Sequence, residues 1–74
     1  ASKPDPAIYL LAARTLQAAP AHCVVLEDAA LGVQAAKAAG MYCIGYRNPH
    51  SGQQDLSRAD AVVDRIRDID ISRL

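Results

Sequence analysis

The sequence predicts an α/β fold in which helices flank a small parallel sheet. Two short apolar runs, Cys23 to Leu26 and Met41 to Tyr46, are separated by strong helix formers from Ala30 to Ala39. Strand, helix and strand in roughly 24 residues have the size of a compact βαβ unit. Such a unit has parallel strands and a right-handed crossover.

The first helix is predicted over residues 6–17. Asp5 is a favoured N-cap residue, and Pro6 suits the first helical position because its ring presets φ. Residues 18–22, which include Pro20, end this helix. The spacing of the apolar residues predicts an inner face made of Ile8, Leu11, Ala12 and Leu16.

The two apolar runs are expected to form buried strands. Cys23 to Leu26 is rich in β-branched residues and bounded by polar ones, which is typical of a fully buried strand. Cys23 and Cys43 stand at the starts of these strands, so we expect both to act as small buried hydrophobes. Gly40 follows the second helix where a left-handed C-cap belongs.

The last third of the sequence is more irregular. Residues 47–59 contain Asn-Pro and Ser-Gly pairs and predict a long loop, a kind that is often functional. Asp60 to Asp64 predicts a short further strand. The tail that follows is interpreted as a short terminal helix, although its isoleucines mix helical and extended spacing.

The chain is short for an independent domain. With 74 residues it would bury only about 60% of the surface of its unfolded chain. Its two cysteines could form at most one disulfide, and their spacing is not that of a zinc site. We therefore expect it to be part of a larger unit.

The charge balance excludes several classes of partner. Eight basic and eight acidic residues leave no basic patch for nucleic acid or an anionic membrane surface. The longest apolar run, residues 7–13, is far below the roughly 20 residues that span a bilayer, and no basic and apolar leader precedes it. We expect a soluble, cytoplasmic chain that binds neither nucleic acid nor membrane.

Two adjacent acidic residues, Glu27 and Asp28, follow the first predicted strand. Ligands of open parallel sheets bind beyond the carboxyl ends of the strands, and carboxylates suit a hard divalent cation. Because neighbouring strand residues point to opposite faces, we expect one direct ligand and one supporting partner. Asp28 would equally suit an N-cap of the next helix, a role for which glutamate is not favoured.

Lys3 is the other candidate functional residue. Its ammonium group is a point charge suited to a phosphoryl oxygen, although most lysines are solvated surface residues. His22 and His50 lie in predicted loops without a second ligand at metal spacing, so we expect an ordinary surface role or a hydrogen-bonded structural one. No nucleophile elbow or phosphate-binding glycine loop is found in this sequence.

The order of these motifs carries more information than any one of them. Lys3-Pro4-x-Pro6, a capped helix, Val24 to Ala29, and Gly32 to Met41 follow one another. This order resembles the haloacid dehalogenase-like (HAD) hydrolase superfamily, in the branch of phosphoglycolate phosphatases and β-phosphoglucomutase-like enzymes, over residues 2–70. The resemblance implies that residues 1–74 are the C-terminal half of a Rossmann-like parallel sheet core with flanking helices.

The resemblance also implies an activity. It suggests a Mg²⁺-dependent hydrolase, either a phosphatase or a phosphomutase, that acts on a small phosphorylated metabolite through an aspartyl-phosphate intermediate. Lys3 matches the phosphate-contacting lysine of the family, and Asp28 and Glu27 match its metal-binding acidic pair. Asp28 would be the direct ligand, and Glu27 would bind the metal or its water.

In the family, the nucleophilic aspartate, the acid/base aspartate and the cap domain precede the lysine. None of them is found in this sequence, so we expect the chain by itself to be inactive and to need the N-terminal half of the core. The alternative is a non-catalytic α/β binding module. In it, Lys3, Glu27 and Asp28 only cap helices or interact with solvent. A further alternative is a chain that self-associates through the sheet edge left exposed.

Overall fold

A three-stranded parallel sheet forms the centre of the fold, which a computed structural model describes for residues 5–73. The strands are β1 (Val24–Glu27), β2 (Tyr42–Tyr46) and β3 (Ala61–Val63), and they lie in the order β1-β2-β3. Their carboxyl ends therefore meet at one edge of the sheet, as the predicted βαβ unit requires. The predicted parallel α/β fold is confirmed.

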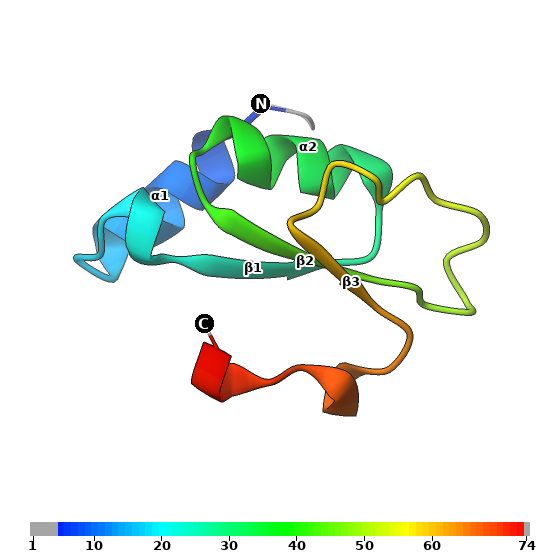
Figure 1. The fold of residues 1–74 in the computed structure, drawn as a ribbon. Coiled ribbons are helices and arrows are strands. Elements are labelled where there is room, and N and C mark those ends of the chain that lie inside the picture. Colours follow the sequence, from blue (N-terminus) through cyan, green and yellow to red (C-terminus); the bar gives the residue numbers. More distant parts are fainter. Residues whose placement is uncertain (1–4, 74) are drawn as a thin grey trace.

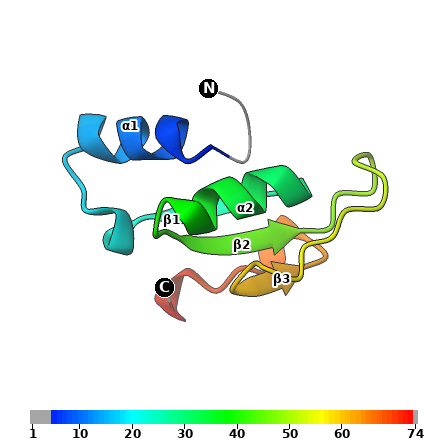
Figure 2. The same ribbon diagram turned by 90° about the horizontal axis from the view of Figure 1, so that it is seen from above.

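Two helices, α1 (Ala7–Thr15) and α2 (Ala30–Ala38), cover one face of this sheet (Figure 1). Helix α2 connects β1 to β2, and α1 lies on the far side of α2 from β3 (Figure 2). Within residues 5–73, no helix is both long and apolar enough to cross a membrane.

Small side chains let α2 lie close to the sheet. One buried cluster joins the helix to β2 and the long loop through Val33, Ala36, Cys43 and Leu56. Burial, with a smaller contribution from nearby Asp60, raises the pKa of the Cys43 thiol to about 11, so this cysteine acts as the predicted buried hydrophobe. Cys23 is only half-buried, and neither cysteine forms a disulfide.

A left-handed glycine ends α2. Gly40 has a φ of +78°, and its amide donates to the Lys37 carbonyl at 3.0 Å. The Met41 amide donates to the Ala36 carbonyl at 3.1 Å. These two bonds form a Schellman motif, which confirms the predicted C-cap and starts the chain on β2.

The predicted inner face of α1 is wrong. Ile8, Leu11 and Leu16 are 67%, 61% and 75% exposed, and Ala12 is exposed as well. Tyr9 and Ala13, one helical turn apart, face the core instead. Only this narrow strip of α1 meets α2 and the sheet, so tertiary placement overrides the apolar spacing.

The ends of α1 also differ from the prediction. The helix begins at Ala7, so Pro6 takes the N-cap position, while the Asp5 carboxylate still accepts the Ala7 amide at 2.8 Å. The helix ends at Thr15 rather than Gln17. Gln17 adopts a φ of +56°, and a residue in this conformation terminates a helix.

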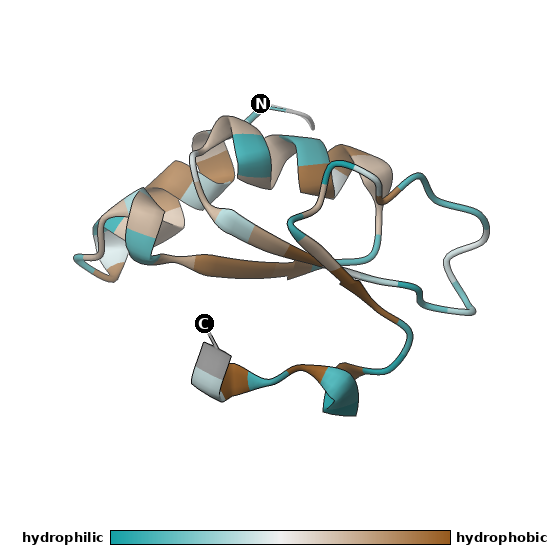
Figure 3. Ribbon diagram, in the orientation of Figure 1, coloured by the Kyte–Doolittle hydropathy of each residue, from teal (hydrophilic) through white to brown (hydrophobic). Residues whose placement is uncertain are grey.

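Strand β1 is not fully buried, as was predicted for the first apolar run. Val24 and Leu26 are 45% and 44% exposed, because both helices lie on the other face of the sheet. In Figure 3, β1 and β3 are largely brown, the colour of hydrophobic residues, while the loop 47–59 is mostly hydrophilic. The predicted terminal helix is instead two short 3₁₀ turns, Ile66–Asp68 and Ile71–Arg73. They lie on the side of the sheet away from α1 and α2 (Figure 1).

Candidate functional site

Glu27 ends β1 and turns toward the helices. Its Oε2 atom accepts the Tyr9 hydroxyl at 2.7 Å, and its Oε1 atom accepts the Ala29 amide at 3.3 Å. Burial and the hydrogen bond to Glu27 raise the pKa of Tyr9 well above its usual value. Tyr9 is therefore a neutral phenol at physiological pH and donates its hydroxyl hydrogen to Glu27.

Gly32 provides the space for the Glu27 side chain. A Cβ atom at this position in the first turn of α2 would overlap the Cγ, Cδ and Oε2 atoms of Glu27. Gly32 itself is buried. The absence of a side chain on this helix residue thus lets the carboxylate lie against the helix and reach Tyr9.

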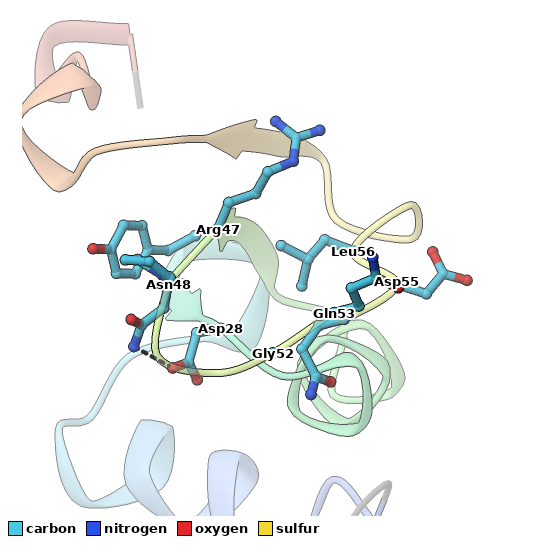
Figure 4. Close-up of a pocket in the computed structure, with 10 residues that line it drawn as sticks. Asp28, Arg47, Asn48, Gly52, Gln53, Asp55 and Leu56 are labelled. Carbon is cyan, nitrogen blue, oxygen red and sulfur yellow. Dashed lines mark hydrogen bonds between the residues drawn. The ribbon is translucent and has the colours of Figure 1, made fainter.

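Asp28 is held by the loop that follows β2. Its Oδ2 atom accepts the Asn48 side-chain amide at 3.0 Å (Figure 4). The same atom accepts the Ser51 hydroxyl at 2.6 Å. The Ser51 bond, followed by the Asn48 bond, holds the pKa of Asp28 below its usual range. Asp28 is thus an ionised carboxylate whose orientation is fixed by two donors.

The same loop is attached to the start of α2. The Gln54 side chain accepts the Ala30 amide at 3.0 Å through Oε1 and donates to the Ser51 carbonyl at 3.0 Å through Nε2. The N-cap residue of α2 is Ala29, which makes no side-chain cap. The alternative of Asp28 as an N-cap is therefore wrong, because Gln54 satisfies the first helical amide instead.

A cavity of about 670 Å³ opens beside Asp28. Its walls come from the end of β2 and from the long loop (Figure 4). Arg47 turns away from Asp28 in this view and pairs with Asp64 at 3.2 Å. The lining residues are Asp28, Tyr46, Arg47, Asn48, Pro49, Gly52, Gln53, Gln54, Asp55 and Leu56.

Another carboxylate near the sheet has a structural role. The Asp60 Oδ2 atom accepts the Lys37 ammonium at 2.7 Å and the Cys43 amide at 2.8 Å. These bonds, the one from Lys37 first, lower the pKa of Asp60. Asp60 thereby joins the end of α2 to the start of β2, away from the carboxyl end of the sheet.

The structure brings two of the three candidate residues to one strand end. Glu27 and Asp28 are neighbours there but face different elements, as the alternation along a strand predicts. Lys3 lies outside the described residues. Gly32 was named from the sequence only as part of the motif order, without a role beside Glu27, and the contact of Tyr9 with Glu27 was not predicted.

Sequence reasoning also missed Asn48, Ser51 and Gln54 individually. The unusual length of the loop 47–59 was the signal that could have found them. His22 and His50 are exposed, as predicted. Among residues 5–73, no three His, Cys, Asp or Glu side chains gather closely enough to hold a metal ion.

The donor chemistry nevertheless fits part of a Mg²⁺ site. Mg²⁺ prefers oxygen ligands and is commonly bound through one or two carboxylates, with waters and substrate phosphate completing the octahedron. Asp28 is ionised and oriented by donors on one of its two oxygens. The described residues therefore fit a site to which this chain contributes one or two carboxylate ligands.

Comparison with known proteins identifies the same family as the motifs. The family model for haloacid dehalogenase-like hydrolases matches residues 1–40, more than half of the chain. A CBBY-like protein of Arabidopsis thaliana is 56% identical over 66 residues, which cover 89% of this chain and 21% of that protein.

Two solved structures extend the likeness to the fold. A β-phosphoglucomutase from Clostridium difficile gives a TM-score of 0.84 at 32% identity, over 99% of this chain and 31% of that one. A mutant of CbbY from Rhodobacter sphaeroides, in complex with xylulose-1,5-bisphosphate, gives a TM-score of 0.79 at 39% identity. The match covers 86% of this chain and 28% of that one. This chain spans less than a third of each of these three proteins. Motifs, fold and relatives agree, and the predicted Rossmann-like, HAD-like sheet is confirmed: the chain belongs to the haloacid dehalogenase-like hydrolase family.

Proposed function

We propose that this chain supplies the metal-binding side of the active site of a HAD-family phosphatase or phosphomutase. The observation that carries the proposal is the Asp28 carboxylate, which two side-chain donors orient at the carboxyl end of the parallel sheet. This is the edge at which open α/β sheets bind ligands. In this proposal, residues 1–74 are the C-terminal portion of the core domain.

Asp28 is the residue proposed to bind Mg²⁺ directly. Its Oδ2 atom is engaged by Ser51 and Asn48, which makes Oδ1 the ligand atom. When bound, the metal would neutralise charge on the phosphoryl oxygens of the substrate. The residues of this chain hold the carboxylate ionised and oriented before the metal arrives.

Glu27 is proposed to act through a metal-bound water. Both of its oxygens already accept hydrogen bonds, from Tyr9 and from Ala29. A carboxylate oxygen can accept more than one hydrogen, so a metal-bound water can donate to Glu27 while both of these bonds persist. Glu27 thus serves as the supporting member of the acidic pair.

Lys3 is proposed to contact the phosphate. It stands two residues before Asp5 in the sequence, and the resemblance matches it to the phosphate-contacting lysine of the family. A lysine ammonium there would stabilise negative charge on a phosphoryl oxygen.

We place the nucleophilic aspartate that would form the aspartyl phosphate in a part of the polypeptide outside this chain. The support is that the chain spans less than a third of its relatives and that the resemblance puts this aspartate before Lys3. The isolated chain would then be inactive. The proposed substrate is a small phosphate ester in the cytoplasm, and the sugar bisphosphate bound by CbbY favours a sugar phosphate.

The test uses the polypeptide encoded by the complete reading frame. We expect Asp28→Asn to lower kcat/KM for Mg²⁺-dependent turnover of glucose 1-phosphate, measured both as released phosphate and as glucose 6-phosphate formed, by about 100-fold or more. The matched control is Asp64→Asn, which removes an exposed carboxylate paired only with Arg47 on the surface. Full Mg²⁺-dependent turnover in Asp28→Asn, or the absence of an upstream Asp-x-Asp segment from the frame, would overturn the proposal.

A self-associating module is the second candidate. It is favoured by the apolar face of the sheet, where Val24, Leu26 and Tyr42 are exposed. Among the described strands β1 pairs only with β2, so its other edge has backbone groups available for pairing. Size-exclusion chromatography of the 74-residue chain over a concentration series tests this candidate, because a monomer at all concentrations contradicts it.

A further inference from the structure

We propose that Asn48 and Ser51 are positioning residues that fix the Asp28 carboxylate and thereby set the metal affinity of the site. This inference rests on the proposed function, because it takes Asp28 as the metal ligand. Both residues donate to the same atom, Asp28 Oδ2, at 3.0 Å and 2.6 Å. Two donors on one oxygen restrict the rotation of the carboxyl group, and in this proposal the other oxygen, Oδ1, binds the cation.

The side-chain amide of Asn48 cannot flip without losing its hydrogen bonds to His50 and Asp28. Its Oδ1 atom accepts the His50 backbone amide at 2.9 Å, so the Nδ2 atom must face Asp28. The Asn48 backbone amide donates to the Tyr46 carbonyl at 2.9 Å, at the end of β2. The donor is therefore anchored to the strand that neighbours Asp28.

Ser51 is anchored from two sides. Its amide donates to the Asn48 carbonyl at 3.1 Å, and its carbonyl accepts the Gln54 side chain at 3.0 Å. Gln54 in turn accepts the amide of Ala30, which begins α2 only two residues after Asp28. The loop and the helix start thus form one bonded frame around the carboxylate.

This frame pre-orients the ligand. A carboxylate that is free to rotate loses rotational freedom when it binds a cation, whereas one already held by donors loses less. Removing hydrogen-bond partners of metal ligands typically costs 10–100-fold in affinity, and about tenfold is the effect expected here for each donor. Asn48 and Ser51 themselves need not contact the metal or the substrate.

The experiment measures Mn²⁺ affinity of the complete polypeptide from the electron paramagnetic resonance signal of free Mn²⁺. We expect Ser51→Ala and Asn48→Ala each to weaken binding by about tenfold. Ser51→Thr keeps the hydroxyl group and should stay within about twofold of the wild type, which a merely structural loss of loop packing would not predict. The matched control is Ser57→Ala, the same substitution in the same loop at a residue bonded to Asp55.

The outcomes separate this inference from the proposed function. If Asp28→Asn and the wild type bind Mn²⁺ equally, the proposed function fails, and the inference fails with it. If Asp28→Asn loses binding but Ser51→Ala and Asn48→Ala retain wild-type affinity, only the inference is overturned. Circular dichroism confirms that each variant is folded, and should Ser51→Ala unfold, the affinity of Asn48→Ala decides the question.

Discussion

Two neighbouring carboxylates are held by two different kinds of structure in this chain. Glu27 is bonded to Tyr9, which lies 18 residues earlier on a helix, and it lies against Gly32. Asp28 is bonded to Asn48 and Ser51, which lie 20 and 23 residues later in a loop. Strand alternation sends adjacent side chains to different surroundings, so these two half-buried carboxylates have partners from different parts of the chain.

The difference has an energetic consequence. Tyr9 packs against both buried clusters, so the surroundings of Glu27 are continuous with the core. Asp28 is surrounded by polar loop residues at the mouth of an open cavity. Substitutions beside Glu27 should therefore reduce the free energy of unfolding, and substitutions beside Asp28 should mainly change metal affinity and acid stability.

The largest stability effect is expected for Gly32→Val. The new side chain would displace Glu27, break its bond to Tyr9 and overpack the contact between α2 and the sheet, at about 3 kcal/mol in all. Urea unfolding followed by circular dichroism measures it. Ala38→Val, at the exposed end of the same helix, is the control and should cost only about 0.5 kcal/mol of helix propensity. Equal losses in the two variants would contradict the close contact between Glu27 and Gly32.

A smaller effect is expected for Tyr9→Phe. It keeps the ring in the core but removes the donor at 2.7 Å from Glu27, so the half-buried carboxylate loses a partner. A charge-assisted bond of this kind contributes about 2 kcal/mol, which urea unfolding would detect. Tyr42→Phe is the matched control, because Tyr42 is exposed. A Tyr9→Phe chain as stable as the control would show that the bond contributes nothing.

The smallest effect concerns acid stability on the Asp28 side. Because the pKa of Asp28 is lowered in the folded chain, its stabilising contribution is complete above the ordinary value of 3.8 and is lost as the pH falls through the folded pKa. Ser51→Ala should raise the folded pKa and reduce this contribution. The acid-unfolding midpoint should then move to higher pH, while Gln53→Ala, in the same loop, should leave it unchanged. An unshifted midpoint in Ser51→Ala would argue against the bond to Asp28.

Much of the fold follows from local sequence signals. The apolar runs around residues 24–46 and the left-handed Gly40 specify strand, helix and strand without help from distant residues. The inner face of α1 does not follow in this way. Ile8 and Leu11 have helical apolar spacing, but what packs against a helix is decided by tertiary placement, and here Tyr9 meets the core.

The candidate site was predictable only in part. The apolar run before them predicts that Glu27 and Asp28 lie at a strand end. The alternation of side chains along a strand predicts that they point to different surroundings. Their partners do not, because Asn48 and Ser51 reach Asp28 across 20 and 23 residues of chain. No local propensity encodes a contact at that separation, which depends on how the loop after β2 folds back over the sheet.

A crystal structure of the complete polypeptide with bound Mg²⁺ tests the central claim most directly. The account predicts Asp28 Oδ1 at about 2.1 Å from the ion, with Ser51 and Asn48 still donating to Oδ2 and Glu27 reaching the ion only through water. An ion that Glu27 binds while Asp28 stays out of its coordination sphere would contradict the account. So would an ion on Asp28 Oδ2 with both loop donors displaced.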